Sequence, residues 1–157
     1  MKIREVTANY RKHEFTVVTG SGETFPFPFS KADPAPTTEN RITTLQVDKE
    51  LAGEGFTYSV ASGDEGSVHV DSVLEYNEDP QYLAEMLLYR LSIEASKRIE
   101  QSPLSRRQIA KRLYTSLPQL YRLLDPTNTK KSMSQLVSLL YVLGCDVDVM
   151  VKNKATA

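Results

Sequence analysis

The sequence lacks the residue patterns of several protein classes. It has a single cysteine, Cys145, which excludes an internal disulfide framework. Its longest apolar-rich stretch, LVSLLYVLG at 136–144, is too short to span a membrane. No long apolar run follows the basic residues of the opening MKIREVTANY, so we expect no signal peptide. With 40% hydrophobic and 25% charged residues, the composition predicts a soluble, cytoplasmic protein.

Motifs of common enzyme classes are also missing. The sequence has no Walker loop, no G-x-G-x-x-G, no H-E-x-x-H and no G-x-S-x-G. His13 and His69 are far apart in the chain, and Cys145 is expected to be a small buried hydrophobe. We therefore expect no metal site, no cofactor and no enzymatic activity. A hydrolase built from scattered residues is the one enzymatic alternative left open.

The net charge of −1 conceals an asymmetry between the two halves of the chain. Residues 1–79 hold 7 Lys and Arg against 14 Asp and Glu, whereas residues 80–157 hold 12 against 6. Residues 97–131 alone hold nine basic and two acidic side chains. An acidic half joined to a basic half indicates two different roles.

The first half has the pattern of antiparallel β structure. Residues 14–30 form two short runs around the turn T-G-S-G, which is a hairpin signal because glycine supplies the positive φ that the turn needs. Residues 56–61 and 68–71 alternate apolar and polar side chains on either side of SGDEG, and 41–48 is another expected strand. The stretch 30–40 is a polar, proline-bearing loop.

The second half has the pattern of helices. Asp79 is suited to cap a helix that starts at Pro80, and leucines at 83, 87 and 91 recur every four residues, so we expect a helix over about 80–101. Three further starts share the pattern S-x-x-Q, at Ser105, Ser116 and Ser132, which is typical of a capping box. The last helix is expected to end at Gly144, and CDVDVMV (145–151) then alternates like a terminal strand with Asp146 and Asp148 on its wet side.

The eleven residues from Ser105 to Ser116 leave room for two helical turns and a short connection. Ile109, Ala110 and Leu113 are expected to form the inner face of the first helix, and Leu120, Leu123 and Leu124 that of the second. A small alanine lets two helices cross closely, which is helix-turn-helix geometry. The sequence thus predicts an α+β fold with a small antiparallel β domain at 1–76 and a helical helix-turn-helix domain at 78–157 that ends in a short strand.

Residues 102–151 resemble the Cro/C1-type (Xre-like) helix-turn-helix family, including antitoxins of the HigA kind. The resemblance lies in SRRQIAKRL, TSLPQLYRLLD and SMSQLVSLLYVLG with the short strand after them, about a third of the chain. The first 76 residues more loosely resemble a small β domain found ahead of some such modules. One departure concerns the turn, where the family usually has glycine and this chain has Tyr114. A tyrosine at positive φ is strained by about 1 kcal/mol.

The resemblance implies a sequence-specific regulator that binds double-stranded DNA as a homodimer. It implies that Arg106 contacts phosphate and that Arg122 is the best reader of a base, because a guanidinium can donate two hydrogen bonds to guanine. Arg107, Lys111, Lys130 and Lys131 suit phosphates. The full set of expected DNA-binding residues is Arg106, Arg107, Lys111, Ser116, Leu117, Pro118, Gln119, Tyr121, Arg122, Lys130 and Lys131.

Two interpretations of function stay open at the level of sequence. In the first, the protein regulates transcription, and its acidic β domain senses a small ligand or holds a partner; the antitoxin version makes that partner a toxin. In the second, the helical half is a protein-interaction or dimerisation module that has lost DNA binding. The basic side chains at 106, 107 and 111 can equally be an ordinary solvated helix face, Tyr121 a core aromatic, and Lys130 and Lys131 a polar loop.

Overall fold

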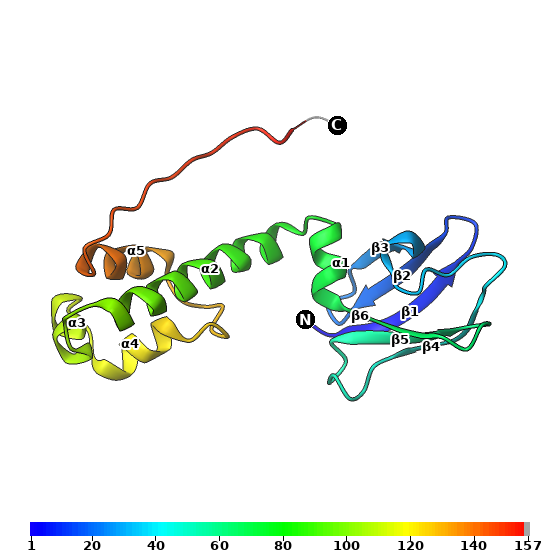
Figure 1. Cartoon of the computed structure of the whole chain (residues 1–157), viewed down its shortest axis with the longest axis horizontal. Coiled ribbons are helices and arrows are strands. Elements are labelled where there is room, and N and C mark those ends of the chain that lie inside the picture. The colour runs from blue at the N-terminus through cyan, green and yellow to red at the C-terminus, as the bar shows by residue number, and fades with distance from the viewer. Residues whose placement is uncertain (156–157) are drawn as a thin grey trace. The chain divides into compact units, whose positions relative to one another are not determined.

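The computed structural model describes residues 1–155 of the chain. They form two compact units that meet between Leu83 and Ala84. The described residues contain two three-stranded antiparallel sheets, five α-helices and one short 3-10 helix, η1 (Phe29–Lys31), so the fold is mixed α and β (Figure 1). No helix in this part of the chain is long and apolar enough to cross a membrane.

The first sheet has the order β1 (Ile3–Asn9), β2 (Glu14–Thr19), β3 (Thr24–Pro28). The predicted hairpin of residues 14–30 is confirmed, since β2 pairs antiparallel with β3 across a turn that contains Gly22 at φ 91°. β1 was not expected from the sequence. It pairs with β2 in a register that shifts between Ile3 and Glu5.

The second sheet has the order β4 (Ile42–Val47), β5 (Gly55–Val60), β6 (Glu65–His69). The strand expected at 41–48 is present as β4, and the turn expected at SGDEG joins β5 to β6. The inner faces of the two sheets share one core, in which the ring of Phe15 lies 4.8 Å from that of Phe56 and 5.2 Å from that of Tyr58. Edge-to-face and tilted aromatic pairs of this kind stabilise beyond their buried area.

The strand pattern expected to continue through Val70 and Asp71 is wrong. The strand ends at His69 and helix α1 (Val70–Tyr76) begins directly after it. His69 caps this helix, because its Nδ1 accepts a hydrogen bond of 3.1 Å from the amide of Asp71. Helical spacing then places Val70, Val73 and Leu74 on one side, where all three are buried in the core of the β unit.

Helix α2 (Pro80–Gln101) matches the predicted range, and the boundary between the two units falls within it. Asp79 caps it as expected, since its Oδ2 accepts a 2.9 Å hydrogen bond from the amide of Tyr82. The other helices are α3 (Arg106–Arg112), α4 (Leu117–Leu124) and α5 (Met133–Val142). The helical core is formed by Ala95, Ile99, Ile109, Ala110, Leu120, Leu123, Leu136, Leu139 and Leu140.

The three S-x-x-Q sequences do start helices. Ser105, Ser116 and Ser132 each accept a hydrogen bond from the amide three residues on. At Ser105 the box is complete, because the Gln108 side chain accepts a 2.8 Å bond from the serine amide. These caps fix where α3, α4 and α5 begin, and therefore which residues of each helix face outward.

The terminal strand expected at 145–151 is wrong. Helix α5 ends as predicted, with Gly144 at φ 81° and the Cys145 amide donating to the carbonyl of Leu140. The residues after it, through 155, have no regular secondary structure. An alternating segment becomes a strand only when a second strand takes its backbone hydrogen bonds. Instead Val149, Met150 and Val151 extend with exposed fractions of 87%, 86% and 90%.

Candidate nucleic-acid interface

The connection between α3 and α4 contains Tyr114. Tyr114 has φ 55°, so the left-handed conformation is adopted without glycine. The backbone closes α3 around it, since the Tyr114 amide donates to the carbonyl of Lys111 at 3.1 Å and the Thr115 amide to that of Ala110 at 3.0 Å. With 98% of its side chain exposed, Tyr114 has no packing that offsets the strain.

Helices α3 and α4 pack through the residues predicted for their inner faces. Ile109 and Leu120 are fully buried, and Ala110 and Leu123 nearly so. Leu113 and Leu124 pack partly against the same core. This packing fixes the rotation of α4 about its own axis, so the outward direction of its polar side chains is defined.

The exposed side chains of α4 point in three different directions. At 100° per residue, Pro118 and Arg122 lie opposite the buried Leu120, whereas Gln119 and Tyr121 flank them on opposite sides. All four side chains are exposed. Gln119 lies toward α5, where it lines a small hollow with Gln135 and Ser138. Tyr121 lies toward α3.

Arg106 and Tyr121 connect the start of α3 with the exposed side of α4. The guanidinium carbon of Arg106 lies 6.0 Å from the centre of the Tyr121 ring, within the range of a cation–π contact. The two residues are fifteen positions apart in sequence, and both are among the expected DNA-binding residues. They are in contact in the structure, and Arg122 is the residue after Tyr121 in α4.

The remaining expected site residues are less closely grouped. Arg107 and Lys111 are exposed on the side of α3 away from Ile109, and Lys130 is exposed in the loop before α5. Ser116 uses its hydroxyl oxygen to cap α4. Leu117 is half-buried against the helical core, so only part of it is presented to solvent.

Lys131 does not lie where a phosphate contact was expected. Only 9% of it is exposed, and its Nζ donates to the carbonyl of Leu123 at 3.1 Å, to that of Asp125 at 2.6 Å, and to Ser92 Oγ. Burial lowers the pKa of Lys131 from its ordinary value, and the nearby Asp125 carboxylate partly offsets that shift. The expectation that Lys131 contacts phosphate is wrong. Lys130 and Lys131 are adjacent and identical in type, so the sequence does not show that one is exposed and the other buried.

Two residues next to the outer face of α4 were missed. Gln135 and Ser138 of α5 are exposed and line the same hollow as Gln119. In the sequence, Gln135 is marked only as part of the S-x-x-Q pattern at Ser132. The signal that would have found them is helical spacing, because 135 and 138 are three apart and face the same way.

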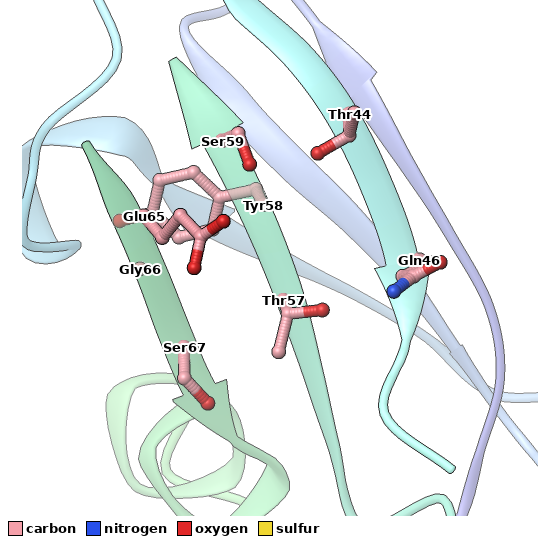
Figure 2. A pocket seen from close by; sticks show the side chains of 8 residues that line it. All are labelled: Thr44, Gln46, Thr57, Tyr58, Ser59, Glu65, Gly66 and Ser67. Atoms are coloured by element: carbon pink, nitrogen blue, oxygen red, sulfur yellow. The ribbon is translucent and has the colours of Figure 1, made fainter. Parts of the chain in front are cut away.

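The β unit has a shallow polar hollow of about 390 Å³ on the outer side of β4, β5 and β6. Figure 2 shows its hydroxyl, amide and carboxylate groups along three neighbouring strands. Such groups can hydrogen-bond a polar ligand, but the hollow is open. Its lining residues are Thr44, Gln46, Thr57, Tyr58, Ser59, Glu65, Gly66 and Ser67.

The two histidines and the cysteine each have structural contacts within their own unit. His69 caps α1, and His13 lies with its ring 6.4 Å from that of Phe29. Cys145 is half-buried and packs against the helical core. Within residues 1–155, no group of three or more His, Cys, Asp or Glu side chains is placed to hold a metal ion.

Comparison with known proteins adds no relative: no family model, no curated protein and no solved structure matches the chain.

Proposed function

We propose that the helical unit binds double-stranded DNA and that the protein is a sequence-specific transcriptional regulator of the Cro/C1 type. In this proposal α4 enters the major groove with Pro118 and Arg122 facing the bases. The contact that supports it best is that of Arg106 with Tyr121, because it joins the start of α3 to the outer side of α4 in one surface. A helix pair presents such a surface when its second helix lies in the groove and its first crosses the backbone.

The charge distribution supports the same proposal. Nine basic residues lie within 97–131 against two acidic ones. Apart from the buried Lys131, those expected at phosphates are exposed: Arg106, Arg107, Lys111 and Lys130. The net charge of −1 is no obstacle, because screening over about 8 Å at physiological salt makes the local basic surface matter more than distant acidic residues.

Each helical unit offers one reading helix of eight residues, Leu117–Leu124. Proteins of this kind gain specificity by binding two half-sites as a two-fold dimer, so we propose a homodimer. The exposed Leu83 and Leu87 of α2, or the extended segment 145–151, supply apolar surface for it. Sedimentation that shows only monomer at micromolar concentration, with and without DNA, would exclude the dimer.

The acidic β unit is assigned a different role. Residues 1–79 carry twice as many acidic as basic side chains, which opposes phosphate, so we propose that this unit holds a small ligand or a partner protein. In the antitoxin form of the proposal that partner is a toxin, and the protein represses its own synthesis.

The test is selection of bound sequences from random duplex DNA with the full chain. We expect enrichment of a motif with two-fold symmetry and half-sites about one helical turn apart. A steep fall in affinity with salt should accompany it, because phosphate contacts release counterions. Absence of any enriched sequence, with binding that does not depend on salt, contradicts the proposal.

The alternative is an interaction module without DNA binding. The observation that favours it is the exposed apolar group of Val149, Met150 and Val151. This alternative predicts self-association or partner binding that persists when no duplex of any sequence is bound. The same selection experiment, combined with sedimentation, therefore separates the two functions.

A further inference from the structure

The ammonium group of Lys131 joins two helices of the helical unit. Two of its acceptors, the carbonyls of Leu123 and Asp125, belong to the C-terminal end of α4. The third, Ser92 Oγ, belongs to α2. Ser92 is fully buried and Lys131 nearly so, which means that this contact is made inside the protein and out of reach of a nucleic acid.

The hydrogen bonds at this point are complete only with a charged lysine. Ser92 donates its own hydroxyl hydrogen to the carbonyl of Leu88 at 2.7 Å, so its oxygen accepts from Lys131. An ammonium has three N–H donors, and each meets one acceptor here, whereas a neutral amine has two. A cation at the C-terminal end of a helix is also favoured by the helix dipole.

The loop that carries Lys131 is itself folded against α4. Asn128 Nδ2 donates to the carbonyl of Arg122 at 3.2 Å, and the Thr127 amide donates to Asp125 Oδ1 at 2.9 Å. The loop after α4 is therefore hydrogen-bonded back to the C-terminal end of α4. Arg122 is one residue away from Leu123, whose carbonyl Lys131 holds.

We propose that Lys131 is a positioning residue for the reading helix: its ammonium holds the C-terminal end of α4 against α2 and so sets the direction of Arg122. The inference rests on the proposed function, and it assigns to Lys131 a part in specificity without contact to DNA. Lys130, its exposed neighbour, keeps the expected role at a phosphate.

The test compares Lys131→Met with the matched variant Lys130→Met in the full chain. Each is bound to the selected duplex and to a scrambled one across a salt series, at a temperature where circular dichroism shows both variants folded. We expect Lys131→Met to lower the ratio of specific to scrambled affinity by about tenfold with an unchanged salt slope. Lys130→Met should weaken both duplexes alike and lower the slope by roughly 0.9.

Three outcomes overturn the inference. A folded Lys131→Met with a lower salt slope and a uniform loss makes Lys131 a phosphate contact. A folded Lys131→Met with an unchanged ratio gives Lys131 a role in stability alone. If Lys131→Met does not fold, Ser92→Ala replaces it, because it keeps the ammonium and removes only the anchor on α2. Ser92→Ala should lower the ratio in the same direction, and an unchanged ratio rejects the inference.

A failure of the proposed function has a different signature. If the wild-type chain binds no duplex, the proposed function is wrong, and amide hydrogen exchange then tests the contact by itself. The amides of α4 should exchange faster in Lys131→Met than in Lys130→Met. Equal exchange in the two variants shows that Lys131 does not hold α4, whatever the helix binds.

Discussion

Gly66 lies directly opposite Tyr58 in the pairing of β5 with β6, and the tyrosine ring fills the space where a side chain at 66 would be. A Cβ atom on Gly66 would overlap Cζ and Oη of that ring and lie 2.7 Å from its Cε1. Tyr58 is only 1% exposed, and its hydroxyl donates a 2.6 Å hydrogen bond to the carbonyl of Pro34. The absence of a side chain at 66 thus leaves room for the Tyr58 ring to lie over Gly66 on the neighbouring strand, and Figure 2 shows the two residues side by side.

We expect Gly66→Ala to destabilise the β unit by about 1–3 kcal/mol, because a new methyl group in a packed core displaces its neighbours. Urea unfolding followed by tyrosine fluorescence measures this change. Gly63→Ala is the comparison variant. A Cβ at residue 63 would have no atom within 4 Å, so only the positive φ of that residue penalises the substitution. A stability of Gly66→Ala equal to that of the wild type would show that the ring moves aside freely.

Tyr58 also gives a prediction for alkaline solution. Burial raises the pKa of Tyr58 from its ordinary value of 10.0 to about 12, and Asp33 adds to the shift. Between pH 10.0 and about 12 the unfolded chain loses this proton while the folded chain keeps it. The stability linked to Tyr58 is therefore fully present below pH 10.0 and is lost as pH rises through about 12.

Tyr58→Phe should remove this part of the pH dependence. At neutral pH it should cost about 1 kcal/mol for the lost hydrogen bond to Pro34. The measurement is the free energy of unfolding of both proteins in urea at neutral and at alkaline pH. The same alkaline loss in wild type and variant would contradict the assignment to Tyr58.

Tyr114 tests the strain in the connection before α4. We expect Tyr114→Gly to raise the free energy of unfolding by about 1 kcal/mol, because glycine adopts φ 55° without a steric penalty. Tyr114→Ala is the control, since alanine keeps the penalty and removes the ring. If Tyr114→Ala stabilises as much as Tyr114→Gly, the exposed ring and not the backbone carries the cost.

Local chemistry explains which parts of this fold were predictable. The three capping serines, the hairpin turns and the Asp79–Pro80 start act within three or four residues, and each occurs where the sequence placed it. β1 was missed because its residues Arg4, Glu5 and Thr7 weaken the alternation, and it becomes a strand by pairing with β2. The helix after His69 was missed because a histidine cap is not a common start signal.

Contacts between distant residues explain the rest. Lys131 and Ser92 are 39 positions apart, and nothing in either neighbourhood marks one as the partner of the other. The segment 145–151 has the alternating pattern of a strand, but in the described chain no second strand pairs with it. Alternation predicts which side chains of a strand would be buried. It does not predict whether a neighbouring strand is present to accept and donate the backbone hydrogen bonds.

The last prediction distinguishes base reading from attraction to phosphate. Arg122 lies in the outward direction of α4, opposite the buried Leu120, and its guanidinium can donate two hydrogen bonds to a guanine. Arg122→Ala should then cost about 1–3 kcal/mol on the selected duplex and relax the preference at one base position. Lys130→Ala should weaken every sequence alike and lower the salt slope by roughly one unit. The measurement is the affinity of both variants for selected and scrambled duplexes across a salt series. If Arg122→Ala loses the same affinity on both duplexes, α4 does not read bases through this side chain.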